Sequence, residues 1–174
     1  AGGFVYCDGA NFNAIVGKVR PGDLAIDAMH INLHKTFSTP HGGGGPGSGP
    51  VVFSVALTAF APLPLVEKQG DHYVLVEEET AGEHHGSSFG RMTAFHGQMG
   101  MFTRALTYIL SHGADGLKQV AEDAVLNANY VLRSLEGMLD APFGGSGPCM
   151  HEALFSDKGL AEGFSTLDIA KGLI

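Results

Sequence analysis

The pattern of apolar and polar positions predicts three strands in the first third of the chain. Asp27–Leu33 is apolar at alternate positions, as expected of a strand with one buried face. Two shorter apolar runs flank it, so that the predicted strands are 4–7, 27–33 and 51–55. Helical signals at 11–17 and from Pro21 separate the first two strands, and this order of elements predicts an α/β fold.

Further along the chain the apolar spacing becomes helical. Apolar residues recur every three or four positions over 114–138, which predicts a long helix, and a second helix over 96–111 is separated from it at His112–Gly113. Ser165, with Asp168 three residues on, is the start signal of a last helix. The remaining predictions are a short helix and loop at 56–66, a strand at 72–77, a loop at 83–90, turns at 142–148 and a strand at 149–155.

Charge and composition exclude several classes of protein. The formal net charge of the 174-residue chain is −8, which argues against nucleic acid or an anionic membrane as the main partner. No apolar run approaches the roughly 20 residues that span a bilayer. The two cysteines, Cys7 and Cys149, are too few for a disulfide framework, and we expect both to stay reduced. The chain lacks an initial Met and begins and ends inside predicted elements, so we expect it to be an internal piece of a longer chain.

A single lysine, Lys35, lies between the central predicted strand and a glycine-rich loop. Eight of the ten residues 41–50 are Gly or Pro, and ordering such a loop costs much backbone entropy. Chains tolerate that cost where the backbone must approach something closely, so we expect the loop to form the floor of an active site. A lone lysine is most often a surface charge, but partial desolvation at such a floor makes its amine a nucleophile able to form a Schiff base.

Pyridoxal phosphate (PLP) is the cofactor that uses such a lysine, and its ring nitrogen needs an acidic partner. Asp8 follows the first predicted strand, 27 residues before Lys35, where open α/β sheets place ligand-binding groups. Taken alone, Asp8 is an ordinary turn aspartate; the pairing with Lys35 favours a cofactor site. His34 and His41 flank the lysine, and the nearby hydroxyls that could bond phosphate are Thr36, Ser38 and Thr39.

Two other kinds of site fit the sequence less well. The glycine loop is not followed by Gly-Lys-Ser/Thr, so a nucleotide P-loop is rejected. Asp27, His30 and His34 have metal-site spacing only if their segment is helical, because on a strand the two histidines lie roughly 13 Å apart. His84–His85 is predicted to be solvated loop. No metal site is therefore expected, and Asn127 and Asn129 have no explanation in the pattern.

At this point the motifs resemble one family. HINLHKTFSTPHGGGGPGSGP with the upstream YCDGAN closely resembles glycine dehydrogenase (decarboxylating), the P-protein of the glycine cleavage system, and most of all the second subunit of its two-subunit bacterial form. The similarity continues through GLKQVAEDAVLNANYVLRSL and PCMHE to TLDIAKGL. The resemblance implies a fold-type-I, aminotransferase-like PLP enzyme, with part of the large PLP-binding domain at 1–112, a connecting helix at 113–138 and the start of the small domain at 139–174.

The resemblance also implies roles for individual residues. Lys35 matches the Schiff-base lysine that holds PLP covalently, and Asp8 matches the aspartate on the ring nitrogen. Ala10 matches the small residue against the ring face, and His34 matches the histidine before the lysine, expected to act with it in catalysis. The remaining expected cofactor contacts are Thr36 and His41.

The implied reaction is decarboxylation of glycine, with transfer of an aminomethyl group to the lipoyl arm of H-protein. The implied partners are glycine, lipoylated H-protein and a first P-protein subunit or second copy, in bacterial cytoplasm or, for a eukaryotic source, the mitochondrial matrix. The alternatives are another fold-type-I PLP decarboxylase or aminotransferase, or a non-catalytic partner subunit. Thr93–Gln98 departs from the SFYGN-like pattern expected there, which leaves the roles of His96 and Gln98 open. We expect this piece alone to be inactive.

Overall fold

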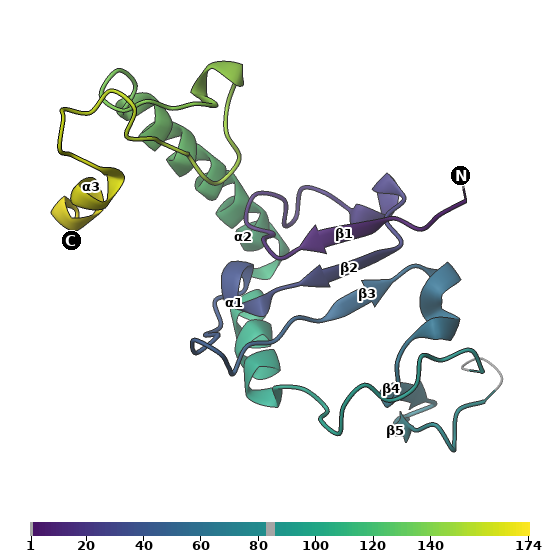
Figure 1. Cartoon of the computed structure of the whole chain (residues 1–174). Coiled ribbons are helices and arrows are strands. Elements are labelled where there is room, and N and C mark those ends of the chain that lie inside the picture. The colour runs from purple at the N-terminus through teal and green to yellow at the C-terminus, as the bar shows by residue number, and fades with distance from the viewer. Residues whose placement is uncertain (1, 83–85) are drawn as a thin grey trace. The chain divides into compact units, whose positions relative to one another are not determined.

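The computed structural model describes residues 2–82 and 86–174, so the predicted loop at 83–90 and His84–His85 lie partly or wholly outside the described residues. The chain divides into two compact units. Unit 1 comprises Ala1–Phe12 and Arg20–Ser111, and unit 2 comprises Asn13–Val19 and His112–Ile174. Figure 1 shows the order of the elements along the chain.

Unit 1 contains a three-stranded sheet in the order β1-β2-β3 (Figure 1). Its strands are β1 Tyr6–Gly9, β2 Ala28–Ile31 and β3 Val51–Phe53. β1 and β2 are parallel, with Asp8 opposite His30, whereas β3 runs antiparallel to β2. Met29 on β2 is 1% exposed and anchors the core of this unit. The three strands predicted from the apolar pattern are thus confirmed, with shifted ends.

The connections around these strands differ in two places from the sequence expectation. The helix predicted at 11–17 is wrong: residues 13–18 form turns, in which Gly17 adopts a φ of 71°. The helical turn predicted at Pro21 is confirmed as a 3-10 helix, Pro21–Leu24. The central strand stops at Ile31, and a short helix, α1 Leu33–Thr36, follows it. Lys35 therefore lies on a helical turn beyond the strand, because burial of Leu33 and Thr36 favours one helical face over strand alternation.

A 3-10 helix, Val55–Phe60, confirms the predicted short helix after β3. The next element is an antiparallel hairpin of β4 Leu65–Gln69 and β5 His72–Val76. β5 was predicted, but β4 was not, because its residues are largely exposed and carry charges that mask the alternation. Gly70, at a φ of 61°, makes the tight turn between the two strands.

The long helix α2 runs from Met99 to Ser134. Gly113 has non-helical backbone angles, φ 64° and ψ −175°, which confirms the predicted break between two helices. The division between the two units falls at the same place, between Ser111 and His112. The predicted apolar face is buried in unit 2 at Ala121, Ala128 and Leu132.

In unit 2 the turns of 13–19 pack on the second half of α2. Lys18 forms an ion pair with Glu122, and a Cβ on Gly17 would lie 3.1 Å from the Lys118 Cα. The strand predicted at 149–155 is wrong: only an isolated bridge joins Asp140 and Ser156 there. The Asn129 side chain instead holds this segment, through hydrogen bonds to the backbone of Cys149.

The last helix, α3 Thr166–Gly172, confirms the start signal read from the sequence. The amide and hydroxyl of Ser165 both donate to Asp168 Oδ2, at 2.9 and 2.7 Å. The hydroxyl contact is the main reason that the pKa of Asp168 is lowered.

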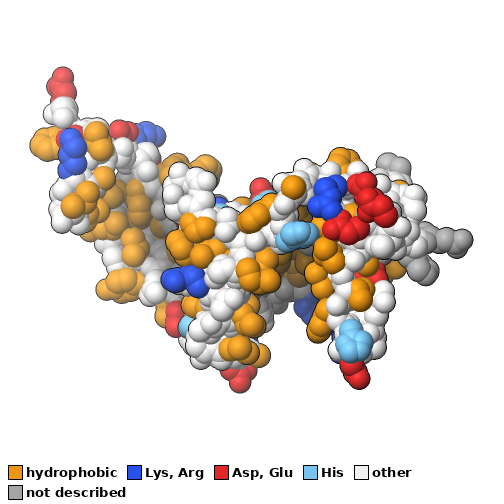
Figure 2. All heavy atoms as spheres, turned by 90° about the horizontal axis from the view of Figure 1, so that it is seen from below, with side chains coloured by type: hydrophobic (Ala, Val, Ile, Leu, Met, Phe, Trp, Pro, Cys, Tyr) orange, Lys and Arg blue, Asp and Glu red, His pale blue; other side chains and the backbone are white. Residues whose placement is uncertain are grey.

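Large apolar side chains remain exposed on both units, and Figure 2 shows hydrophobic groups across one face. None of the helices in the described residues is long and apolar enough to cross a membrane.

Candidate functional site

The predicted site residues belong to two segments that meet at the carboxyl edge of the sheet in unit 1. β1 and β2 are parallel, so the loops that follow them leave the sheet at the same edge. The buried amide of Phe12, four residues after Asp8, donates to the hydroxyl of Thr36 at 2.9 Å. This bond fastens the loop behind Asp8 to the helix that carries Lys35.

Asp8 is exposed, but its carboxylate is held firmly on one side. Oδ1 accepts a hydrogen bond from the Ala10 amide at 2.9 Å and lies 3.2 Å from Nε2 of His30. Oδ2 has no hydrogen-bond partner among the described residues. The carboxylate is thus oriented by two donors on the same oxygen, and its other oxygen is available to an incoming donor.

His30 links Asp8 to Tyr6 across the two strands. The Tyr6 hydroxyl lies 2.5 Å from His30 Nδ1, and the two rings stack with centroids 5.9 Å apart at 22°. Tyr6 and Asp8 are two residues apart on β1, so they share a face of the sheet, and His30 on β2 lies opposite Asp8. Nothing in the sequence pattern indicated this contact, because it depends on the register between two strands.

Lys35 is exposed on α1, so the prediction that its side chain is partly desolvated is wrong. Its neighbours explain the orientation of the helix: Leu33 and Thr36 are buried and fix the inner face. Thr36, expected as a cofactor contact, is 5% exposed and accepts the Phe12 amide. The lysine amine thus projects from a short helix whose inner face is anchored beside the loop after β1.

His34 lies in a constrained polar environment next to the lysine. Its Nδ1 is buried and has no hydrogen-bond partner among the described residues. The His41 ring stands edge-on to the His34 ring with centroids 5.0 Å apart. Burial, followed by the nearby His41 and then the Lys35 charge, lowers the pKa of His34 below its usual 6.5. The structure therefore places His41 and Lys35 beside His34.

The glycine loop folds back along β2 through backbone hydrogen bonds. Leu33 donates to Ser48 at 3.0 Å, and Ile31 donates to Pro50 at 2.9 Å. Gly42 adopts a φ of 65°, and a Cβ there would lie 1.6 Å from the Gly45 carbonyl oxygen, so only glycine fits. The Thr39 hydroxyl beside the loop is buried and lacks a partner in the described part of the chain.

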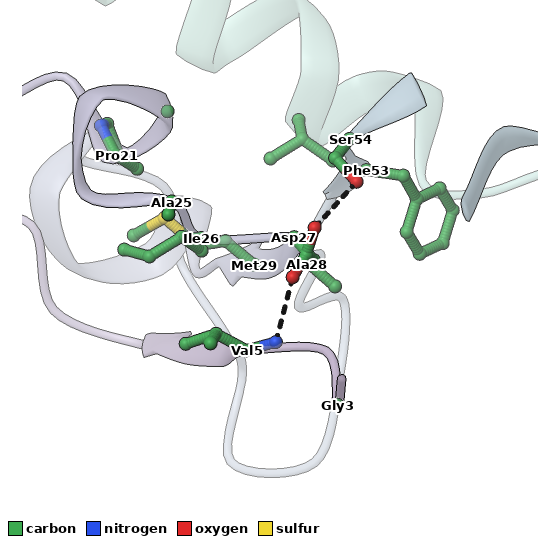
Figure 3. A pocket seen from close by; sticks show the side chains of 12 residues that line it. Gly3, Val5, Pro21, Ala25, Ile26, Asp27, Ala28, Met29, Phe53 and Ser54 are labelled. Atoms are coloured by element: carbon green, nitrogen blue, oxygen red, sulfur yellow. Dashed lines mark hydrogen bonds between the residues drawn. The ribbon is translucent and has the colours of Figure 1, made fainter. Parts of the chain in front are cut away.

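Asp27, weighed above as a metal ligand, has a structural role at the opposite end of the strands. Its carboxylate accepts the Val5 amide at 2.9 Å and the Ser54 hydroxyl at 3.0 Å (Figure 3). It lines a largely apolar hollow of about 500 Å³ with Val5, Ala25 and Met29. The described residues contain no group of three or more His, Cys, Asp or Glu side chains arranged to hold a metal ion.

The fold has a counterpart among solved structures. A glycine decarboxylase (P-protein) of the glycine cleavage system, crystallised in an inhibitor-bound form, aligns with 80% of this chain and 38% of its own at a TM-score of 0.56 and 19% identity. The architecture is therefore the α/β fold of fold-type-I PLP-dependent enzymes.

Sequence comparison identifies the family more narrowly. The chain is 63%, 51% and 50% identical to the probable glycine dehydrogenase (decarboxylating) subunit 2 of Caulobacter vibrioides, Oceanobacillus iheyensis and Thermotoga maritima, over 99–100% of its length. It belongs to the family of glycine dehydrogenase (decarboxylating) subunits. The chain spans about a third of the length of these curated relatives, 33–35%. No family model matches it.

Proposed function

We propose that this chain is the lysine-bearing part of a PLP-dependent glycine decarboxylase of the glycine cleavage system. The observation that carries the proposal is the 63% identity, over the whole chain, to a relative named as glycine dehydrogenase (decarboxylating) subunit 2. In this assignment residues 1–112 belong to the large cofactor-binding domain, 113–138 form the connecting helix and 139–174 begin the small domain. The chain would act as part of the longer subunit.

The chemistry of the carboxyl edge fits PLP. Asp8 offers an oxygen, Oδ2, with no partner among the described residues, while Oδ1 is already held by Ala10 and His30. Lys35 supplies an accessible amine from the neighbouring helix, and His34 supplies a buried ring nitrogen without a partner. A carboxylate, an amine and an unpaired polar atom at one sheet edge match what the ring nitrogen, the aldehyde and the remaining polar groups of PLP require.

Bound PLP supplies an electron sink for the carbanion left by decarboxylation. Lys35 would hold the cofactor covalently through its side-chain amine. Asp8 would keep a proton on the ring nitrogen, which makes the ring a stronger sink. Ala10 would leave room for the ring face, His34 and His41 would border the site beside the lysine, and Thr36 would hold the lysine's helix in position.

The substrate and partners follow from the same family assignment. Glycine would lose carbon dioxide, and the remaining aminomethyl group would pass to the lipoyl arm of H-protein. A name that specifies subunit 2 supports a first P-protein subunit as the assembly partner. The named relatives are bacterial, which supports the bacterial cytoplasm as the compartment.

Cofactor labelling of the complete subunit, assembled with its partner subunit, tests the proposal. Incubation with PLP followed by borohydride reduction should attach the cofactor to the peptide containing Lys35, and Lys35→Ala should abolish the label. Glycine should change the absorption of the bound cofactor and should exchange its carboxyl group with bicarbonate. Failure of PLP to bind would instead favour a non-catalytic subunit, and binding without any response to glycine would favour another amino acid as substrate.

A further inference from the structure

We infer that Tyr6 and His30 are positioning residues that hold the Asp8 carboxylate aimed at the cofactor ring nitrogen; this inference rests on the proposed function. His30 is the first residue of the motif HINLHKTFSTPHGGGGPGSGP, but the sequence assigned it no role toward PLP. Its side chain lies between those of Tyr6 and Asp8. It contacts Tyr6 through Nδ1 and Asp8 through Nε2, so both ring nitrogens are engaged.

The carboxylate decides which ring nitrogen of His30 carries the proton. Asp8 Oδ1 can only accept, so at 3.2 Å the facing Nε2 must carry a hydrogen to make a favourable contact. Nδ1 of the neutral ring is then an acceptor, which the Tyr6 hydroxyl satisfies as a donor. The reverse tautomer would place two lone pairs against each other. The three side chains therefore form one directed chain of donors, from Tyr6 through His30 to Asp8.

Directing these donors to Oδ1 leaves the other carboxylate oxygen, Oδ2, available to a ligand. The Ala10 amide and His30 also restrict rotation of the carboxylate, because both bind the same oxygen. Oδ2 is thus left pointing away from its own protein partners. An acceptor fixed in this way is preorganised for a protonated ring nitrogen, much as the outer partners of metal-ligating side chains orient them.

The ring stacking gives Tyr6 a second contribution. Its ring lies against His30 at 22°, so it limits rotation of the imidazole out of the line between the two strands. Tyr6→Phe would keep this stacking and remove only the hydroxyl. It therefore separates the hydrogen bond from the packing and serves as the variant least harmful to the fold.

Two forms of the cofactor distinguish a positioning role from a merely structural one. In the complete assembled subunit, His30→Leu should raise the Kd for PLP about tenfold, as loss of an outer partner does at metal sites. It should leave the Kd for the deaza analogue, in which carbon replaces the ring nitrogen, unchanged. Tyr6→Phe should act in the same direction with a smaller effect. His30→Gln, whose amide can still donate to Asp8, should recover much of the PLP affinity.

A double substitution adds a second readout that does not depend on turnover. In an Asp8→Asn background, His30→Leu should weaken PLP binding no further, because the group through which it acts is gone. His72→Gln, an exposed histidine on β5, is the matched control and should change neither Kd. Equal weakening of both cofactors by His30→Leu, or effects of Asp8→Asn and His30→Leu that simply add, would overturn the inference.

The proposed function and this inference fail in different ways. If the unsubstituted protein binds no PLP, the proposed function fails and the inference fails with it. If it binds PLP on Lys35 but His30→Leu and Tyr6→Phe leave both Kd values unchanged, the function stands and the inference is wrong. Circular dichroism of each variant shows whether it folds. If His30→Leu is misfolded, the Kd values of Tyr6→Phe test the inference instead.

Discussion

The amide of Phe12 donates to the hydroxyl of Thr36 across 2.9 Å, in a buried position that joins the loop after β1 to helix α1. Asp8 is four residues before the donor, and Lys35 directly precedes the acceptor. One hydrogen bond thus couples the two segments that carry the predicted cofactor groups. The donor and the acceptor are 24 residues apart in the sequence.

Removing the Thr36 hydroxyl, which accepts the hydrogen bond from Phe12, should lower the stability of the folded protein. Thr36→Val leaves the buried Phe12 amide unpaired, which costs about 1–3 kcal/mol of folding free energy. Thr36→Ser keeps the hydroxyl and should retain most of the stability. Urea unfolding of the complete subunit measures both, and equal stability of the two variants would show that the bond contributes nothing.

Gly9, at the end of β1, should not tolerate a side chain. A Cβ there would lie 2.2 Å from the His30 carbonyl oxygen and 2.4 Å from the Met29 Cε, so β1 and β2 would have to separate. Gly9→Ala should cost about 1–3 kcal/mol, in the range of other overpacked positions. Gly3→Ala is the matched control, because nothing lies within 4 Å of the added Cβ. Thermal unfolding compares them, and a Gly9→Ala variant as stable as Gly3→Ala would contradict the predicted clash.

Asn129 should be more important for unit 2 than its neighbour Asn127. Its amide donates to the Cys149 carbonyl at 2.7 Å and accepts the Cys149 amide at 2.9 Å, as a neighbouring strand would. Asn129→Ala should therefore destabilise the protein by about 1–3 kcal/mol. Asn127 on the same helix is exposed, and Asn127→Ala should stay within about 0.5 kcal/mol. Denaturant titrations of the two variants test this, and similar losses would refute a specific clamp.

The lowered pKa of His34 predicts how stability changes with pH. In the unfolded chain His34 takes up a proton near pH 6.5, whereas in the folded chain burial, His41 and Lys35 oppose it. The unfolded state then binds more protons, so stability should fall as the pH falls through 6.5, until the folded-state pKa is reached. His34→Gln should flatten this part of the curve, as the midpoint of urea unfolding against pH would show.

The charge of Lys35 is one cause of the His34 shift, which gives a separate test. In the cofactor-free protein, Lys35→Met removes a nearby positive charge and should raise the pKa of His34 towards 6.5. The imidazole proton resonances followed by NMR against pH report this value directly. A His34 titration that does not respond to Lys35→Met would mean that the two side chains do not interact.

Much of the fold and of the site could be read from local sequence. The alternation of apolar residues indicated the sheet strands, the Gly113 break divided the long helix, and Ser165 with Asp168 marked the start of the last one. The positive φ at Gly42 also follows from a local steric requirement. These features depend on neighbouring residues only, so the residues themselves carry the information.

Contacts between distant segments were decided by the tertiary structure alone. The pairing of Asp8 with His30 needs a particular register of two parallel strands, and a shift by one residue would turn His30 to the other face. The exposure of Lys35 depends on which face of α1 is buried, and the contacts of Asn129 depend on a segment twenty residues away. The sequence by itself therefore indicated the family, the three strands of the sheet in unit 1 and the residue types present at positions 8 and 35. Only packing between segments decided that His30 is the second donor to Asp8 beside the local Ala10 amide, because the contact depends on the register of two strands.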